Sequence, residues 1–232
     1  MSDHTTILIP GLICDGIVWD PIVDQLGDKT FIADLTTQND LTDMARDCLA
    51  LSDGNLRVAG HSMGARVALE MARLAPERIE RLALLDTGIH PLKDGERAKR
   101  DEIVEFAYAN GMQALSDRWL PGMVHPDRHQ DAALMNALNA MVLRQTADIH
   151  ARQINALINR PDAAAYLASI TCSVLLMVGR QDAWSPLSQH QDMLNLLPDA
   201  RLIVIENAGH FAPVERPETT AAELVPFLTE NS

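Results

Sequence analysis

The sequence predicts an α/β protein built around a mostly parallel, doubly wound sheet, and three observations support this. Short runs of β-branched and aliphatic residues alternate with segments of helical periodicity, as in consecutive βαβ units. Several of these runs are apolar at every position, which is typical of strands buried on both faces. Of the 232 residues, 47% are hydrophobic and 22% are charged, so the chain can bury a substantial core.

Six of the apolar runs are predicted to be strands of this sheet. A helix is predicted directly after the third run, because Val67, Met71 and Leu74 recur at helical spacing and Pro76 closes the pattern. The predicted strands are Thr5–Ile9, Lys29–Ala33, Leu56–Gly60, Arg81–Asp86, Ser173–Gly179 and Arg201–Glu206.

Strand signals disappear between residues 92 and 168. Apolar residues there recur at helical spacing, for example Leu134, Leu138 and Met141, and glycine and proline residues separate the helical runs. Because this stretch interrupts the series of strands, we interpret it as a helical cap inserted over the sheet. The chain then divides into a first core segment (1–91), the cap insertion (92–168) and a second core segment (169–232).

Charge and cysteine content exclude several classes of protein. The formal net charge is -13, with 19 Lys and Arg against 32 Asp and Glu, which argues against a nucleic-acid partner. Cys14, Cys48 and Cys172 lack metal-ligand spacing, so we expect reduced thiols, no metal and no cofactor. The N-terminal run is too short for a signal peptide, and no apolar run approaches the ~18 residues of a membrane span. We expect a cytoplasmic protein that does not insert into membranes.

A serine stands between two glycines where a predicted strand ends and a helix begins. The segment Gly60–Gly64 (GHSMG) matches the pattern G-x-S-x-G in its expected strand-turn-helix context. Such a turn strains the serine backbone, and the flanking glycines remove side chains that would collide there. The hydroxyl then lies at a helix N-terminus, which favours developing negative charge. Ser62 is therefore the predicted nucleophile.

Partners for this serine are predicted further along the chain. His210, in the loop after the last predicted strand, is the candidate base, and Asp182, just past the fifth, is the candidate acid. The order serine, acid, histidine agrees with the strand-turn-helix nucleophile pattern. Asp86 also follows a strand end and remains an alternative acid. Cys14, a possible nucleophile in the loop after the first strand, is interpreted as a small buried thiol.

With these residues the chain resembles the α/β-hydrolase superfamily, in its branch of small esterase-like and lactonase-like serine hydrolases with a helical cap. The segment Ile9–Pro21 (IPGLICDGIVWDP) is similar to the family's first-strand loop, with Pro10 and Gly11 where His-Gly is more common. The resemblance implies an oxyanion hole formed by the backbone N–H groups of Leu12 and Met63. It also implies a shortened sheet of about six strands, in which the usual N-terminal hairpin is missing.

These residues together predict a serine hydrolase for a small ester-like molecule. Ser62 would attack a carboxylic ester, thioester or lactone to form an acyl-enzyme, with His210 as base and Asp182 holding the imidazole. Two alternatives stay open from the sequence. The same fold also carries lyase or elimination chemistry, in which His210 acts as a base on the substrate, and a related binding module would keep the pocket without turnover.

Overall fold

One six-stranded sheet forms the centre of the structure, a computed structural model that describes residues 4–230. Every neighbouring pair of strands is parallel, and the strand order is β2-β1-β3-β4-β5-β6. This confirms the predicted fold class, and the sheet is parallel throughout its six strands. The strands are β1 (His4–Ile9), β2 (Thr30–Ile32), β3 (Asn55–His61), β4 (Ile79–Leu85), β5 (Ser173–Gly179) and β6 (Ala200–Ile205).

The observed strands begin and end within two residues of the predicted ones. β5 has the predicted bounds, whereas β4 begins two residues earlier than expected. β2 is shorter than predicted, since only three residues pair with β1. It lies at the edge of the sheet with no second neighbour, and Phe31 and Ile32 are 44% and 38% exposed.

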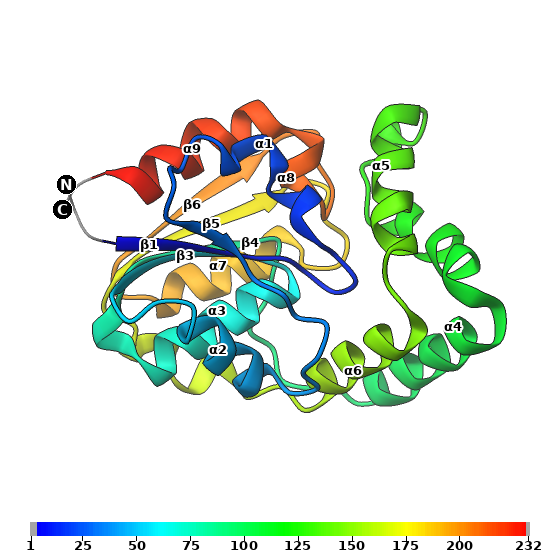
Figure 1. Cartoon of the computed structure of the whole chain (residues 1–232), viewed down its shortest axis with the longest axis horizontal. Helices are drawn as coiled ribbons and strands as arrows, with labels where there is room; N and C mark the ends of the chain where they lie inside the picture. The colour runs from blue at the N-terminus through cyan, green and yellow to red at the C-terminus, as the bar shows by residue number, and fades with distance from the viewer. Residues whose placement is uncertain (1–3, 231–232) are drawn as a thin grey trace.

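Helices cover both faces of the sheet (Figure 1). One face carries α2 (Leu41–Leu49), α3 (Met63–Leu74) and α7 (Leu187–Leu196), and the other carries α1 (Asp20–Val23), α8 (Ala212–Glu215) and α9 (Pro217–Thr229). Alternate strand residues enter different apolar clusters, as the two-residue period of a strand requires. Ile7 packs with the α2–α3 side, whereas Leu8 packs with Trp19 and the α9 residue Leu224.

Helix α3 illustrates why the predicted periodicity holds. Val67 and Met71 are fully buried between α3 and the sheet, and the helix ends at Leu74, two residues before Pro76. The proline cannot continue the helical hydrogen bonding and begins a short 3-10 turn instead. The short 3-10 segments are Gly16–Val18, Pro76–Arg78, Leu120–Gly122, Pro126–Arg128, Ala163–Ala165 and Leu167–Ser169.

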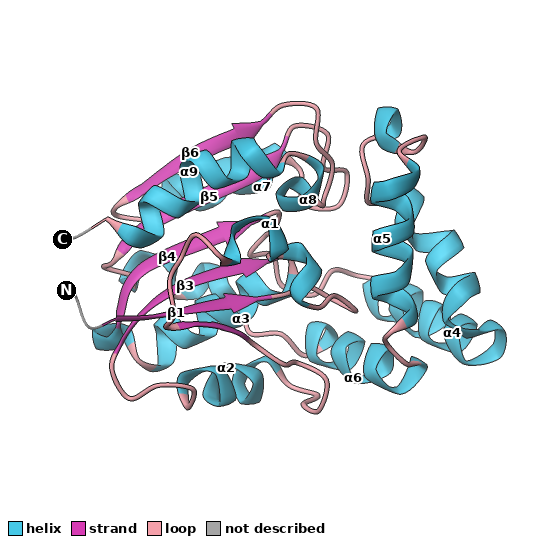
Figure 2. Ribbon diagram, turned by 45° about the horizontal axis from the view of Figure 1, so that its top comes forward, coloured by secondary structure: helices cyan, strands magenta, loops and turns pink. Residues whose placement is uncertain are grey.

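Three helices between β4 and β5 form a layer beyond the carboxyl ends of the strands (Figure 2). They are α4 (Glu96–Trp119), α5 (Ala132–Leu143) and α6 (Ala147–Ile158), and α4 is kinked at Gly111, where φ is 81°. Leu115 and Leu138 of this layer share an apolar cluster with strand residues of the core. Within residues 4–230, no helix has the length and apolar character needed to cross a membrane.

Candidate active site

The turn between β3 and α3 holds Ser62 in a strained conformation. Its φ of 54° lies in the left-handed region, which a side chain disfavours. The turn is fixed by hydrogen bonds to β4 and the residues after it. The Ser62 N–H donates to the Leu85 carbonyl at 2.8 Å, and the Thr87 hydroxyl donates to the Ser62 carbonyl at 3.0 Å. The surrounding sheet therefore overrides the local preference of the residue.

Both glycines of the motif are required by close approaches of the backbone. A Cβ atom on Gly60 would lie 2.5 Å from the Cα of Ala65, and one on Gly64 would overlap the carbonyl oxygen of Ile9. Real Cβ atoms do not come so close to backbone, so any other residue would separate α3 from β3 and β1. The glycines thus set the position of Ser62 in the turn between β3 and α3.

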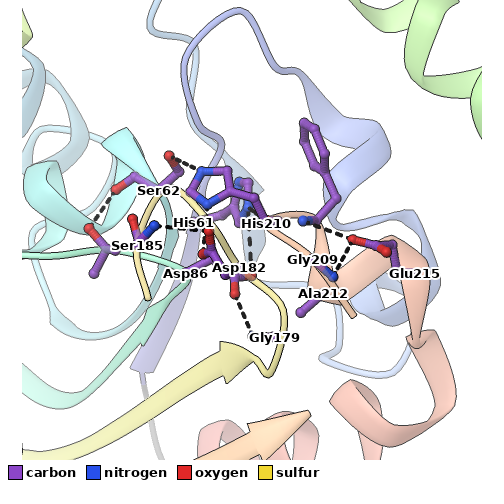
Figure 3. Close-up of polar contacts among 12 residues, drawn as sticks. His61, Ser62, Asp86, Gly179, Asp182, Ser185, Gly209, His210, Ala212 and Glu215 are labelled. Carbon is purple, nitrogen blue, oxygen red and sulfur yellow. Dashed lines mark hydrogen bonds and ion pairs between the residues drawn. The ribbon is translucent and has the colours of Figure 1, made fainter. Parts of the chain in front are cut away.

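Ser62, His210 and Asp182 form a hydrogen-bonded line, as Figure 3 shows. The Ser62 Oγ lies 2.8 Å from the His210 Nε2, and the His210 Nδ1 lies 2.8 Å from the Asp182 Oδ2. Because the ionised Asp182 carboxylate can only accept a hydrogen bond, a neutral His210 imidazole carries its hydrogen on Nδ1 and donates it to Asp182. The Nε2 atom is then free to accept from the Ser62 hydroxyl. The structure thus brings together the three residues that the sequence singled out.

The Asp182 carboxylate is stabilised in its ionised form. Burial by itself would raise the pKa of Asp182, but the adjacent His210 and the backbone N–H groups of Ser185 and Trp184 lower the pKa below its usual value. These two N–H groups donate to Oδ1 at 2.9 and 2.8 Å, so both carboxylate oxygens have partners. The group facing the imidazole therefore bears a negative charge at neutral pH.

Asp86, the alternative acid, lies in a different environment. Its Oδ1 accepts from the Gly179 N–H at 2.8 Å, whereas its Oδ2 lies 3.8 Å from the Nε2 of His61 and has no hydrogen-bond partner. Burial raises the pKa of Asp86 well above its usual value, and the negative charge of Asp182 raises it further. Asp86 therefore supports the loop after β5 and does not contact His210.

His61 lies behind His210 and supports its backbone. The His61 Nε2 donates to the His210 carbonyl at 2.7 Å, and its ring stacks on Phe211 with centroids 5.4 Å apart. Burial lowers the pKa of His61 to about 3, and the nearby His210 adds to this effect. The ring is a neutral hydrogen-bond donor.

Glu215 fixes the loop that carries His210. Its fully buried carboxylate accepts from the Gly209 N–H at 2.9 Å and the Phe211 N–H at 3.2 Å (Figure 3). It also accepts from the His125 N–H at 2.8 Å. Gly209 and Phe211 flank His210, so one side chain clamps the backbone on both sides of the imidazole. The sequence reasoning missed Glu215, although an acidic residue inside the apolar run HFAPVE is a signal that could have found it.

The backbone loop after β1 faces Ser62 from the other side. Met63 is the first residue of α3, so its N–H has no acceptor within the helix. The loop of Leu12 is held from the cap, because the Ile13 N–H donates to the Gln153 Oε1 of α6 at 2.7 Å. Cys14 is buried beside this loop and donates its thiol to the Leu12 carbonyl at 3.2 Å. Burial raises the pKa of Cys14, so it is no thiolate nucleophile.

A cavity of about 810 Å³ opens between this site and the cap. Ser62, His210, Leu12 and Met63 line its core side, and residues of α4 and α6 line the cap side. The volume suits a small molecule. A second cavity, of about 580 Å³, lies at the opposite ends of β4, β5 and β6, where Arg81, Ser173 and Ala200 line it.

A model of the alpha/beta hydrolase family matches residues 6–223. The chain belongs to this family. It is 24% identical, over 97% of its length and 94% of the relative's, to the pimeloyl-[acyl-carrier protein] methyl ester esterase of Aliivibrio fischeri. The fold is also that of a thermophilic esterase from Thermogutta terrifontis (TM-score 0.89, 23% identity, 98% of this chain and 90% of the other). An enol-lactonase from Burkholderia xenovorans LB400 matches with a TM-score of 0.87 at 22% identity, over 99% and 93% of the two chains.

The lowered pKa values of three buried histidines predict how the stability of the protein depends on pH. Burial lowers the pKa of His61 to about 3 and of His150 and His190 to about 4, whereas an unfolded histidine titrates near 6.5. Between about pH 6.5 and 4, these three histidines bind protons in the unfolded chain but not in the folded one. Their contribution to the free energy of unfolding is therefore fully present above about pH 6.5 and is lost as the pH falls toward 4. Each such proton costs about 1.4 kcal/mol per pH unit. Asp86 and Glu215, whose pKa values are raised, offset part of the loss.

Urea unfolding followed by circular dichroism at pH 7.5, 6.5, 5.5 and 5.0 measures this loss. His190→Gln removes one titrating group, a ring whose Nε2 accepts from the Thr87 N–H at 3.2 Å. The variant will be less stable at pH 7.5, but its further loss between pH 6.5 and 5.0 should be smaller by about 2 kcal/mol. If the free energy of unfolding changed equally with pH in the variant and the unmodified protein, His190 would not be neutral in the folded state.

Proposed function

We propose that the protein is a serine hydrolase that cleaves a small carboxylic ester, thioester or lactone through an acyl-enzyme. The observation that carries the proposal is the hydrogen-bonded line from Ser62 through His210 to Asp182, which opens into a cavity at the N-terminus of α3. The family match supports hydrolysis, and the names of the esterase relative and of the enol-lactonase support an ester bond as the target.

In the first half of the reaction, the Ser62 Oγ attacks the carbonyl carbon while its proton passes to the His210 Nε2. The carbonyl π electrons move to the oxygen, and the N–H groups of Met63 and Leu12 donate to the resulting oxyanion. Asp182 remains ionised and stabilises the imidazolium. When the tetrahedral intermediate collapses, the bond to the leaving group breaks, and that group takes the proton from His210.

In the second half, water resolves the acyl group on Ser62. His210, neutral again, accepts a proton from the water as its oxygen bonds to the acyl carbon, and the same N–H groups bind the second oxyanion. Collapse of this intermediate breaks the bond to Ser62, whose oxygen recovers the proton from His210. The products are a carboxylic acid and an alcohol or thiol, or a hydroxy acid if the substrate is a lactone.

The strained turn at Ser62 and the buried residues that hold the reacting groups reduce the motion that these reaction steps require. Ser62 is fixed through β4, His210 through Glu215 and His61, and the loop of Leu12 through Gln153. Each reacting group is therefore held by partners that the reaction leaves unchanged. Such preorganisation lowers the barrier because donors and base need not reorient as charge develops.

Covalent labelling tests the nucleophile. A fluorophosphonate should modify the protein once, on the tryptic peptide that contains Ser62, because the Oγ of this serine lies 2.8 Å from the His210 Nε2 and beside a pair of N–H donors. Ser62→Ala should abolish both the labelling and the hydrolysis of p-nitrophenyl esters. Mass spectrometry locates the label, and product analysis separates hydrolysis from elimination. Labelling at another residue, or an active alanine variant, would refute the proposal.

The two buried aspartates form a matched pair for testing the acid. Asp182→Asn removes the charge that stabilises the imidazolium and should lower kcat by about 10⁴-fold. Asp86, with its raised pKa, is imitated by an amide that keeps the acceptor for the Gly179 N–H, so Asp86→Asn should lower kcat by about tenfold or less. Thermal unfolding measures whether both variants are folded. A folded Asp182→Asn with near-normal kcat would remove Asp182 from the mechanism.

A further inference from the structure

The cavity in front of Ser62 is positively charged, in contrast to the chain as a whole. Six lysine and arginine residues line it against three acidic residues, although the formal net charge of the chain is -13. A cavity of one charge sign concentrates ligands of the opposite sign. The cationic residues are Arg66, Lys93, Lys99, Arg100, Arg118 and Arg160, and the acidic ones are Asp94, Glu96 and Glu102.

Three of these arginines converge around one carboxylate. Glu96 pairs with Arg100 at 2.7 Å through Oε1 and with Arg160 at 2.8 Å through Oε2. Both oxygens of Glu96 are thereby used, and its Oε2 also accepts from the Lys93 N–H. The remaining guanidinium, that of Arg66, donates only to the His90 carbonyl, at a long 3.4 Å, and forms no ion pair among residues 4–230. The cluster has one more cation than its carboxylate can satisfy.

Arg66 is also in the right place to contact a substrate. It follows Ser62 by four residues, so it lies on the same side of α3, about 6 Å further along the helix axis. Its side chain lines the same cavity as Ser62 and His210. Burial, together with the charges of Arg160 and Arg100, lowers the pKa of Arg66 to about 9, so the group remains a cation at neutral pH. Arg66 is partly buried. A cation that is partly desolvated and has no ion pair is stabilised when an anion binds beside it.

We propose that Arg66 binds a free carboxylate on the acyl part of the substrate, so that the preferred substrates are monoesters of small dicarboxylic acids. The proposal rests on the proposed ester hydrolysis at Ser62. A guanidinium presents parallel N–H donors that match the two oxygens of a carboxylate. Because the acyl part stays attached to Ser62 in the acyl-enzyme, Arg66 would hold its carboxylate from first binding until release of the diacid.

Paired substrates of similar size test the charge preference. The monomethyl esters of succinate, glutarate and adipate are compared with methyl esters of monocarboxylic acids of equal carbon number, with acid release measured in a pH-stat. For the best chain length, kcat/KM should be at least 10-fold higher for the hemiester than for its neutral partner. Arg66→Met should reduce this ratio by about 10- to 100-fold, the loss of one charge-assisted, bidentate contact. Arg66→Lys should retain part of it.

Arg118→Met is the matched control. Arg118 lines the same cavity, but it is already paired with Glu102 at 2.9 Å and its side chain is about half exposed. This variant removes the same formal charge from the cavity and should leave the ratio unchanged. If the hemiester preference fell equally in both variants, it would arise from the overall positive charge of the cavity. That result would overturn the specific contact with Arg66. A hemiester preference that is absent from the unmodified protein would overturn the proposal itself.

A binding measurement separates this proposal from the hydrolytic one. Glutarate and adipate are titrated calorimetrically into Ser62→Ala, where no turnover is required, and dimethyl adipate serves as the neutral comparison. The diacids should bind, and adding Arg66→Met should weaken their binding by at least 10-fold. If neutral esters are cleaved but no diacid binds, the carboxylate subsite is wrong and the hydrolase proposal stands. If diacids bind through Arg66 but no ester is cleaved, the carboxylate subsite stands and the hydrolase proposal is wrong.

Discussion

The contact between α3 and the strands on either side of Ser62 is the constraint on which the site depends. Gly64 lies against the carbonyls of Ile9 and Pro10, and Gly60 lies against the first turn of α3. This contact places the N-terminus of α3, the end of β1 and the serine hydroxyl within one small volume. The strain of φ 54° at Ser62 is localised at the residue that must leave the strand direction, and hydrogen bonds to Leu85 and Thr87 compensate for it.

Around this contact, burial, neighbouring charges and hydrogen-bond donors together shift the pKa of each buried acid. Asp182 receives two N–H groups and the imidazole, and its pKa is lowered despite burial. For Asp86, burial and the negative charge of Asp182 outweigh the donors, and for Glu215 burial alone outweighs three backbone N–H donors, so both pKa values are raised. The pKa values of these three carboxyl groups thus shift in different directions, because only Asp182 has the His210 imidazole as a direct partner. Only the one facing His210 is stabilised as an anion.

Much of the fold could be predicted from sequence because its signals are local. Apolar strands, the helix after Ser62 and the absence of strand patterns from 92 to 168 follow from side-chain periodicity. The length of β2 could not be predicted, since an edge strand pairs on one side only and its ends depend on β1. For the site, G-x-S-x-G and the order of the chain pointed to Ser62, Asp182 and His210. The choice between Asp182 and Asp86 required the positions of distant loops.

The roles of the supporting residues could not be predicted from sequence patterns for the same reason. Glu215 acts on backbone N–H groups of its own loop, but its role depends on the course of that loop under the cap. Gln153 contacts Ile13, which is about 140 residues away along the chain. Arg66 faces Glu96, which is about 30 residues away. Nothing in the local sequence around either residue distinguishes it from an ordinary polar position on an amphipathic helix. Tertiary contacts, and not motifs, determine what these side chains do.

The hydrogen bond from Ile13 to Gln153 has a consequence for the modularity of this architecture. A cap inserted between two strands can in principle be exchanged for another without disturbing the sheet. Here α6 also supplies the acceptor that holds the loop after β1, and its Arg152 donates to the Thr36 carbonyl after β2. A transplanted cap that lacks an amide at the place of Gln153 would leave a buried N–H of the core unpaired. Recombination between relatives is therefore restricted to caps that carry this one side chain, or to joint replacement of cap and loop.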